Sequence, residues 1–198
     1  MTFADMLRSE FDDLQLEIPR PATEKLALYA SEVEHWNRSI NLTSLQGTAL
    51  IRRLIVDPVW MGMKLEMKGA LADVGSGNGS PGIPLSITRP FSSTDLIEPR
   101  SKRAVFLRHL AAKAELKTIA VHRCRVENVP AKTLAVDWIT LQAVDPTAVV
   151  LQALAGIGRS TTRVVWITSL MIPPVAAAER WDVPGSNTRI WVFRLDQI

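Results

Sequence analysis

Glycine residues gather around one turn in the middle of the chain, where their spacing could hold a small ligand. Four glycines fall within eight positions: Gly75, Gly77, Gly79 and Gly82. Glycine tolerates positive φ and lets a ligand approach the backbone, so such a cluster is typical of a turn built around a bound molecule. An apolar run ending in Asp73 precedes the cluster, and Pro84 suits the first turn of a helix after it. A strand, a glycine turn and a helix in this order form the nucleotide-binding corner of a doubly wound α/β sheet.

The glycine spacing distinguishes between two adenosine ligands. A dinucleotide turn has glycine at relative positions one, three and six, but the sixth position here is Ser80. The observed G-x-G-x-G after an acidic strand end resembles the turn of S-adenosylmethionine-dependent methyltransferases. That cofactor has a sulfonium, an amino group and a carboxylate instead of a pyrophosphate, so Asp73 could order the turn or answer the ligand's positive charge. A hydride-transfer enzyme is therefore the remote alternative. The cofactor contacts expected here are Asp73, Gly75, Ser76, Gly77, Gly79 and Ser80.

A second acidic residue strengthens the adenosine interpretation. Glu98 ends the next predicted strand and follows Asp73 by 25 positions. An acid at this place can accept hydrogen bonds from both ribose hydroxyls of an adenosine. Sites for NAD use the same device, so Glu98 supports an adenosine ligand without choosing between the two cofactors.

Hydrophobic periodicity predicts the elements that position these residues. Helical patterns cover 3–16, 23–40, 49–63, 102–116 and 146–154, with Pro58 expected to kink or end the third. Strand patterns cover 94–98, 118–122, 136–141, 163–168 and 189–195, and 176–183 could hold a sixth strand after a short helix. Alternating strands and helices imply a largely parallel sheet covered on both faces. We expect an α/β, Rossmann-like class I methyltransferase fold, with residues 1–66 as a helical cap on a core of 67–198 in one compact unit.

Three strings of the sequence resemble the RsmG (GidB) family. They are YASEVEHWNRSINLTSL at 29–45, ADVGSGNGSPGIPLSI at 72–87 and LIEPRSKRAVFLRHLAAKAEL at 96–116. Members of that family are bacterial methyltransferases that use S-adenosylmethionine to methylate N7 of a guanine in small-subunit ribosomal RNA. The likeness runs from about residue 20 to 145. It implies cofactor contacts at Gly75, Ser80 and Glu98, and at Val126 and Glu127, which would bracket the adenine.

The reaction of that family needs no catalytic side chain to create the nucleophile. Guanine N7 has a free lone pair at neutral pH, so the enzyme must align two atoms and exclude water, which can lower a barrier by roughly 7–11 kcal/mol. No triad or nucleophile is evident in the sequence, and we assign no certain catalytic residue. The scattered histidines have no metal-ligand spacing, so no metal is expected.

Three positions depart from the family pattern. The family's arginine at the end of the fourth strand is Gln142, which can donate hydrogen bonds but has no charge. The histidine of the third helix is Leu54, and the lysine near the end of the fifth strand is Thr168 or Ser169. Two alternatives therefore stay open: a catalytically altered relative that serves as an RNA-binding or assembly module, and a methyltransferase for a different substrate.

Composition and charge are compatible with an RNA-modifying protein. One cysteine, Cys124, excludes an internal disulfide and fits a reducing cytosol, so we expect a cytoplasmic location, and no apolar run approaches a membrane span. The net charge of +3 permits nucleic-acid binding. The expected partner is ribosomal RNA or the small ribosomal subunit, bound by a monomer. Cations that could contact RNA are Arg52, Arg53, Arg100, Lys102, Arg103, Arg108, Arg123 and Arg125. Those from Arg100 to Arg103 also lie beside Glu98, so some of them could serve the cofactor site instead.

Overall fold

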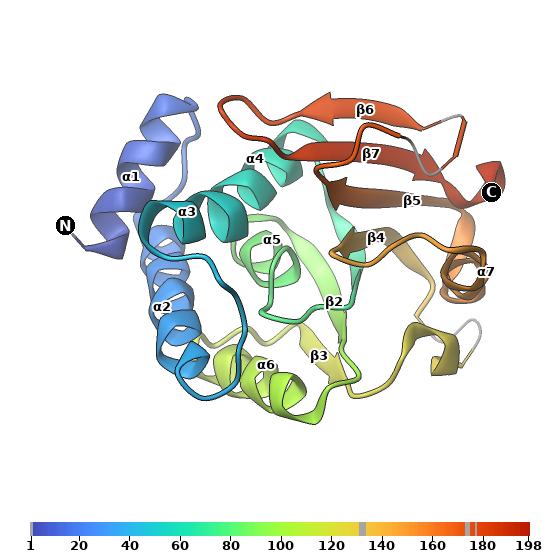
Figure 1. The fold of residues 1–198 in the computed structure, drawn as a ribbon, viewed down its shortest axis with the longest axis horizontal. Helices are drawn as coiled ribbons and strands as arrows, with labels where there is room; N and C mark the ends of the chain where they lie inside the picture. Colours follow the sequence, from blue (N-terminus) through green and yellow to red (C-terminus); the bar gives the residue numbers. More distant parts are fainter. Residues whose placement is uncertain (1, 131–133, 173–174, 177) are drawn as a thin grey trace.

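One twisted sheet occupies the centre of the computed structural model, which describes residues 2–130, 134–172, 175–176 and 178–198 (Figure 1). Its strands are β1 (Gly69–Val74), β2 (Phe91–Ile97), β3 (Ile119–His122), β4 (Val136–Gln142), β5 (Gly158–Thr168), β6 (Glu179–Asp182) and β7 (Arg189–Arg194). They lie in the order β3-β2-β1-β4-β5-β7-β6. The first five are parallel, whereas β7 runs antiparallel to both β5 and β6. The predicted α/β fold with a mostly parallel sheet is confirmed.

The central strand β1 is buried on both sides of the sheet. Leu71 belongs to the apolar core on one face and Ala72 to the core on the other, and both are fully buried. This explains why the strand appears in the sequence as a continuous apolar run without alternation. Strand order reverses at β1, which pairs with β2 on one side and β4 on the other. The carboxyl ends of β1 and β4 therefore flank the crevice where ligands bind in open α/β sheets.

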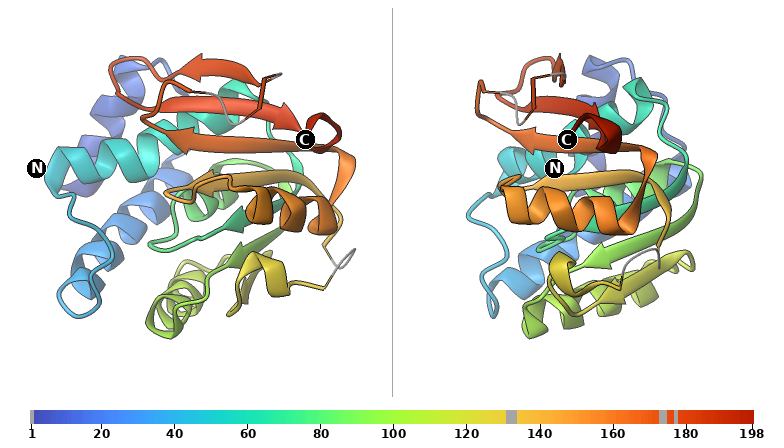
Figure 2. Two further views of the ribbon diagram at one scale, coloured as in Figure 1. Left: turned by 45° about the vertical axis from the view of Figure 1, so that its right-hand side comes forward. Right: turned by 90° about the vertical axis from the view of Figure 1, so that its right-hand side faces the viewer.

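Helices cover the two faces of the sheet unequally, as the views in Figure 2 illustrate. Most of them pack on the face that Leu71 lines. They are α1 (Phe3–Asp13), α2 (Arg20–Asn37), α3 (Gly47–Ile51), α4 (Asp57–Lys64), α5 (Gly82–Thr88) and α6 (Ser101–Lys113). The opposite face packs against α7 (Ala148–Ile157) and the short helix η2 (Val126–Asn128). The helices of residues 1–66 share one hydrophobic core with the sheet. Their assignment as a separate cap therefore stays a prediction.

Two local predictions need correction. The third helix does not end at Pro58: it continues to Lys64 through a π-helical turn, η1 (Arg52–Val56), shortly before the proline. The alternative that Pro58 kinks the helix stays a prediction. A wider turn suits this place, because Pro58 has no amide proton to donate to the preceding turn. Between β5 and β6, the described residues 169–172, 175–176 and 178 form no helix, although β6 itself supplies the sixth strand.

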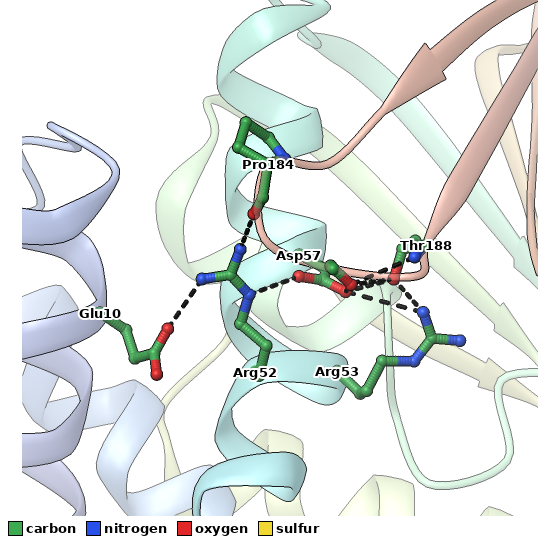
Figure 3. Close-up of polar contacts among 7 residues, drawn as sticks. Glu10, Arg52, Arg53, Asp57, Pro184 and Thr188 are labelled. Atoms are coloured by element: carbon green, nitrogen blue, oxygen red, sulfur yellow. Dashed lines mark hydrogen bonds and ion pairs between the residues drawn. The ribbon is translucent and has the colours of Figure 1, made fainter.

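A polar cluster joins the π-helical turn to α1 and to the loop between β6 and β7 (Figure 3). The carboxylate of Asp57, 2% exposed, accepts hydrogen bonds from Arg52 Nε at 3.1 Å and from the hydroxyl groups of Ser186 and Thr188. Arg52 also forms an ion pair with Glu10 of α1 at 2.8 Å and donates to the carbonyl group of Pro184. The cluster therefore fastens α1 and the β6–β7 hairpin to the same helix.

Among the described residues, none of the helices has the length and apolar character that crossing a membrane requires.

Candidate cofactor site

The glycine turn after β1 exposes its backbone to a crevice. Gly75 and Gly77 both adopt positive φ, +76° and +50°. The Gly75 amide donates to the carbonyl group of Ile97 at 2.8 Å, which fixes the turn against the end of β2. A Cβ atom on Gly75 would lie 2.4 Å from Val144 Cγ2, so no side chain fits there. At Gly77, a Cβ atom would meet nothing nearer than 3.5 Å, so this side of the turn is open.

The side chain of Glu98 binds the backbone of the turn at Gly77. Its Oε2 accepts a hydrogen bond from the Gly77 amide at 2.9 Å, and its Oε1 accepts one from the Arg100 amide at 2.7 Å. The side chain is almost completely buried, with 3% of its surface exposed. Each carboxylate oxygen can accept a second hydrogen bond. The predicted hydrogen bonds from ribose hydroxyl groups would be these second hydrogen bonds. This contact of Glu98 stays a prediction.

Asp73 lies beneath the turn rather than in the crevice. It is 1% exposed, and its Oδ1 accepts a hydrogen bond from the Thr140 hydroxyl at 2.7 Å. Burial raises the pKa of its carboxyl from 3.8 to about 6, although hydrogen bonds from Thr140 and Ser76 oppose that shift. Of the two roles expected from sequence, the position favours ordering the turn. Tyr29 of α2 is also buried there, and desolvation raises the pKa of its hydroxyl group.

Two adjoining pockets open on the turn and share Gly75. The first, here called the apolar pocket, has a volume of about 390 Å³ and is lined by Val74, Gly75, Ile97, Pro99, Arg100, Arg125, Val126, Glu127, Val144 and Val150. The second, here called the polar pocket, has a volume of about 240 Å³ and is lined by Leu42, Gly75, Ser76, Gly77, Asn78, Ser80, Arg103, Gln142 and Ala143. A wider hollow of about 770 Å³ at the opposite edge of the sheet, beside Gly69 and Asp137, contains none of the predicted site residues.

The structure brings together most of the residues that the sequence singled out. Those that line one of the two pockets are Gly75, Ser76, Gly77, Ser80, Arg100, Arg103, Arg125, Val126, Glu127 and Gln142. Asp73 and Glu98 line neither pocket and lie on the buried side of the turn. Gly79 serves packing, because a Cβ atom there would lie 2.9 Å from Ile83 and 3.4 Å from Tyr29.

Other predicted residues lie away from the pockets. The guanidinium groups of Arg52 and Arg53 face the Asp57 cluster, with side chains 16% and 31% exposed. Arg123 is exposed and donates to the Ser101 hydroxyl at 3.5 Å. Among the three departures from the family pattern, only Gln142 lines a pocket. Leu54 is buried in the core, and the Thr168 hydroxyl accepts a hydrogen bond from the Leu170 amide at 3.1 Å.

Leu42 and Val144 are among the hydrophobic pocket residues that the sequence interpretation missed. Leu42 is held by Asn37 at the end of α2, whose Oδ1 accepts from the amides of Leu42 at 2.6 Å and Thr43 at 3.0 Å. The side-chain amide of Asn37 donates in turn to the carbonyl group of Thr43 at 2.8 Å. The WNRSINLT string therefore shapes a loop that brings Leu42 to the polar pocket, and this string was the available signal.

The strand order, the antiparallel β7 and the glycine turn at the switch point are those of the Rossmann-like fold of class I S-adenosylmethionine-dependent methyltransferases. The model of the GidB family, described as rRNA small subunit methyltransferase G, matches residues 22–170. The chain belongs to this family. The match also extends past residue 145, where the resemblance recognised in the sequence ended.

One curated relative supports the family assignment, and two solved structures share the fold. The ribosomal RNA small subunit methyltransferase G of Halorhodospira halophila is 37% identical over 152 residues, which cover 76% of this chain and 71% of that protein. Among solved structures, a variant of MtNAS in complex with S-adenosylmethionine has a TM-score of 0.56 at 15% identity, covering 86% of this chain and 72% of its own. The precorrin-6y C5,15-methyltransferase of Geobacter metallireducens has a TM-score of 0.52 at 13% identity, covering 76% and 89%.

The residues at the turn fit S-adenosylmethionine. The aliphatic side chains of the apolar pocket suit the flat adenine of the cofactor. The open side of Gly77 leaves room for the part of the cofactor that joins the adenosine to the amino acid. Metal ligation finds no support in the described part of the chain, which has no cluster of three or more histidine, cysteine or acidic side chains able to hold an ion.

Proposed function

We propose that the protein is an S-adenosylmethionine-dependent methyltransferase of small-subunit ribosomal RNA, and that guanine N7 is the methyl acceptor. The observation that supports this proposal is the pair of adjoining pockets on the glycine turn, in a chain that belongs to the GidB family. The apolar pocket takes the adenine between Val126 and Val144. The polar pocket takes the amino-acid part of the cofactor and faces the methyl acceptor.

The chain contributes positioning and exclusion of water. When bound, S-adenosylmethionine supplies its methyl group: N7 forms the new N–C bond as the S–C bond breaks, and that electron pair stays on sulfur. No side chain has to remove a proton, because N7 attacks through a free lone pair. Glu98 fixes the Gly77 amide at 2.9 Å, and Leu42, 5% exposed, closes the polar pocket with an aliphatic wall. Alignment of this kind can contribute roughly 7–11 kcal/mol.

The proposed RNA-binding surface surrounds the mouth of the apolar pocket. Arg100 and Arg125 are exposed and line that pocket, and Lys102 and Arg123 are exposed two positions away from them in the sequence. Such side chains bind phosphates with little sequence preference and with an affinity that falls as salt increases. Arg52 and Arg53 are left out of this surface, because their guanidinium groups bind Asp57. Since one chain forms both pockets, we propose that the protein acts as a monomer, in the cytoplasm and without a metal.

Transfer of a labelled methyl group tests the proposal. Purified protein is incubated with S-adenosylmethionine labelled in its methyl group and with small ribosomal subunits from a strain that lacks the gene. We expect label in the ribosomal RNA, and borohydride reduction followed by aniline treatment should cleave that RNA at one guanine. If labelled RNA resists this cleavage, the acceptor is not N7; if calorimetry detects no binding of S-adenosylmethionine, the proposal fails at its first step.

A matched pair of glycine variants links the result to the turn. Gly77→Asp should abolish cofactor binding and leave the fold intact, because its Cβ atom meets nothing within 3.4 Å and aspartate tolerates this backbone region. Gly47→Asp is the control. Gly47 has a similar φ of +52°, a Cβ atom there meets nothing within 4 Å, and it lines neither pocket.

One observation favours a second candidate, a family member that binds RNA or assists ribosome assembly without transferring a methyl group. The polar pocket has the uncharged Gln142 where the family has arginine, and its Oε1 accepts a hydrogen bond from the Ser80 hydroxyl at 3.1 Å. This candidate predicts that the protein binds RNA but labels neither ribosomal RNA nor a small molecule. A methyltransferase for another substrate would instead label a different acceptor in a cell extract.

A further inference from the structure

Arg103 reaches the glycine turn from the first turn of α6. It is half-buried and lines the polar pocket. Its Nη1 lies 3.5 Å from the place that a Cβ atom on Gly77 would occupy, on the open side of the turn. Its Nη2 donates a hydrogen bond at 3.1 Å to the carbonyl group of Asn41, in the loop that Asn37 shapes. The guanidinium group is therefore held in place directly above the backbone of Gly77.

This guanidinium group keeps its charge available to a ligand. Arg103 takes part in none of the ion pairs between described residues, unlike Arg52, which pairs with Glu10 and Asp57. The carbonyl group of Asn41 occupies one of its five N–H donors and pins its position without neutralising it. Two nitrogen atoms of a guanidinium group can bind a carboxylate in a bidentate arrangement.

Every other residue that lines the polar pocket is uncharged. Polar side chains are supplied by Ser76, Asn78, Ser80 and Gln142, and the rest are glycine, alanine or leucine. Gln142 can donate one or two hydrogen bonds but cannot answer a full negative charge. A carboxylate that enters this pocket therefore has one cationic partner among the described residues, namely Arg103.

We propose that Arg103 binds the carboxylate of the amino-acid part of S-adenosylmethionine, and so supplies the charge that is missing at Gln142. This inference rests on the proposed function, because it takes that cofactor as the ligand. It moves Arg103 from the RNA-binding surface expected from sequence to the cofactor site. Arg103 also acts as a specificity residue, because it favours cofactors that retain the carboxylate.

A comparison of two ligands that differ only in this group tests the proposal. Calorimetry measures the affinity of wild-type protein and of Arg103→Gln for S-adenosylmethionine and for its decarboxylated form, which keeps the adenosine, the sulfonium and the amine. We expect Arg103→Gln to weaken the binding of S-adenosylmethionine at least about tenfold, as for a lost charge-assisted hydrogen bond. The affinity for the decarboxylated form should change less than about twofold, because no carboxylate is present to lose its partner.

Lys102→Gln is the matched control, since it removes the same charge from an exposed neighbour that lines neither pocket. It should leave both affinities unchanged. Arg103→Lys keeps the charge without the planar fork and should give an intermediate loss for S-adenosylmethionine alone. This variant also serves as the test if Arg103→Gln melts at a clearly lower temperature.

Three outcomes overturn the inference. Equal weakening of both ligands would mean that Arg103 shapes the loop at Asn41 and does not contact the carboxylate. No weakening of either ligand, with a loss of RNA affinity, would return Arg103 to the RNA-binding surface. If wild-type protein binds neither ligand, the proposed function itself fails, which is distinct from the first two results.

Discussion

The carboxylate of Glu98 bridges two backbone amides, that of Gly77 in the glycine turn at 2.9 Å and that of Arg100 before α6 at 2.7 Å. One buried side chain therefore connects the strand end of β2, the open part of the turn and the entry to the helix that carries Arg103. Both pockets depend on this bridge, because Gly77 lines the polar pocket and Arg100 the apolar one.

Glu98→Ala should loosen the turn and weaken the cofactor site. The substitution leaves the buried Gly77 amide and the partly buried Arg100 amide without their acceptor, and a buried unsatisfied group typically costs about 1–3 kcal/mol. We expect a lower free energy of unfolding in urea and at least about a tenfold loss of affinity for S-adenosylhomocysteine. Glu127→Ala, an exposed side chain at the rim of the apolar pocket, is the control and should leave the free energy of unfolding nearly unchanged. A stable Glu98→Ala protein with wild-type affinity would show that the bridge is dispensable.

The carboxyl of Asp73 should make stability depend on pH near neutrality. Burial raises its pKa to about 6 from an ordinary value of 3.8, so the folded state binds the proton more tightly than the unfolded state. The stabilising contribution is complete below about pH 4 and is lost as the pH rises through 6. Relative to Asp73→Asn, wild-type protein should lose about 2 kcal/mol of unfolding free energy between pH 4 and pH 8.

Urea denaturation of both proteins across this pH range measures the difference directly. Other titrating groups cancel, because they are common to the two proteins. A difference in unfolding free energy that stays constant from pH 4 to pH 8 would mean that Asp73 is ionised throughout and that its pKa is not raised.

Gln142→Arg should compensate for the loss of Arg103. Both residues line the polar pocket, so an arginine at 142 offers a second source of positive charge to the same carboxylate. In the Arg103→Gln background, we expect Gln142→Arg to recover at least about fivefold in affinity for S-adenosylmethionine, about 1 kcal/mol of a charge-assisted hydrogen bond. Calorimetry of the four proteins of this double-mutant cycle gives the coupling. Purely additive effects would place the two side chains at different parts of the ligand.

Asp57→Ala should release the β6–β7 hairpin from the helices. The carboxylate is 2% exposed and binds Arg52, Ser186 and Thr188, so its removal leaves the two hydroxyl groups without their acceptor, whereas Arg52 keeps its ion pair with Glu10. A buried polar group that loses its partner typically costs about 1–3 kcal/mol. The expected result is a lower urea midpoint and faster proteolysis within residues 179–194. Arg180→Ala is the control in the same hairpin: its ion pair with Asp182 is exposed, so its loss should leave the urea midpoint nearly unchanged.

The sequence was sufficient for those parts of the site that local pattern controls. The glycine turn, the strand ends at Asp73 and Glu98, and the position of Gln142 follow from periodicity and from residues close together in the chain. Leu42 and Val144 could not be placed in this way, because their positions depend on a loop held by Asn37 and on the approach of β4 to Gly75. Neither relationship leaves a periodic signal.

The arginines of the third helix show the same limit. Arg52 and Arg53 resemble ordinary solvent-facing cations in the sequence, and both were expected to contact RNA. Their partners at Pro184 and Thr188 lie more than 130 positions away, and the π-helical turn that aims Arg52 at Asp57 has no recognised sequence pattern. Long-range polar partners of this kind become visible only once the chain is folded.

The Asp57 cluster has a consequence for the order in which a newly made chain can fold. Strands β1 to β5 and their helices are synthesised before the β6–β7 hairpin. Asp57 and Arg52 are then already present, but Ser186 and Thr188 follow Asp57 by 129 and 131 positions. Until the β6–β7 hairpin docks, β5 lacks its partner β7 and Asp57 lacks its hydroxyl partners. Docking of this hairpin onto the first helices supplies both.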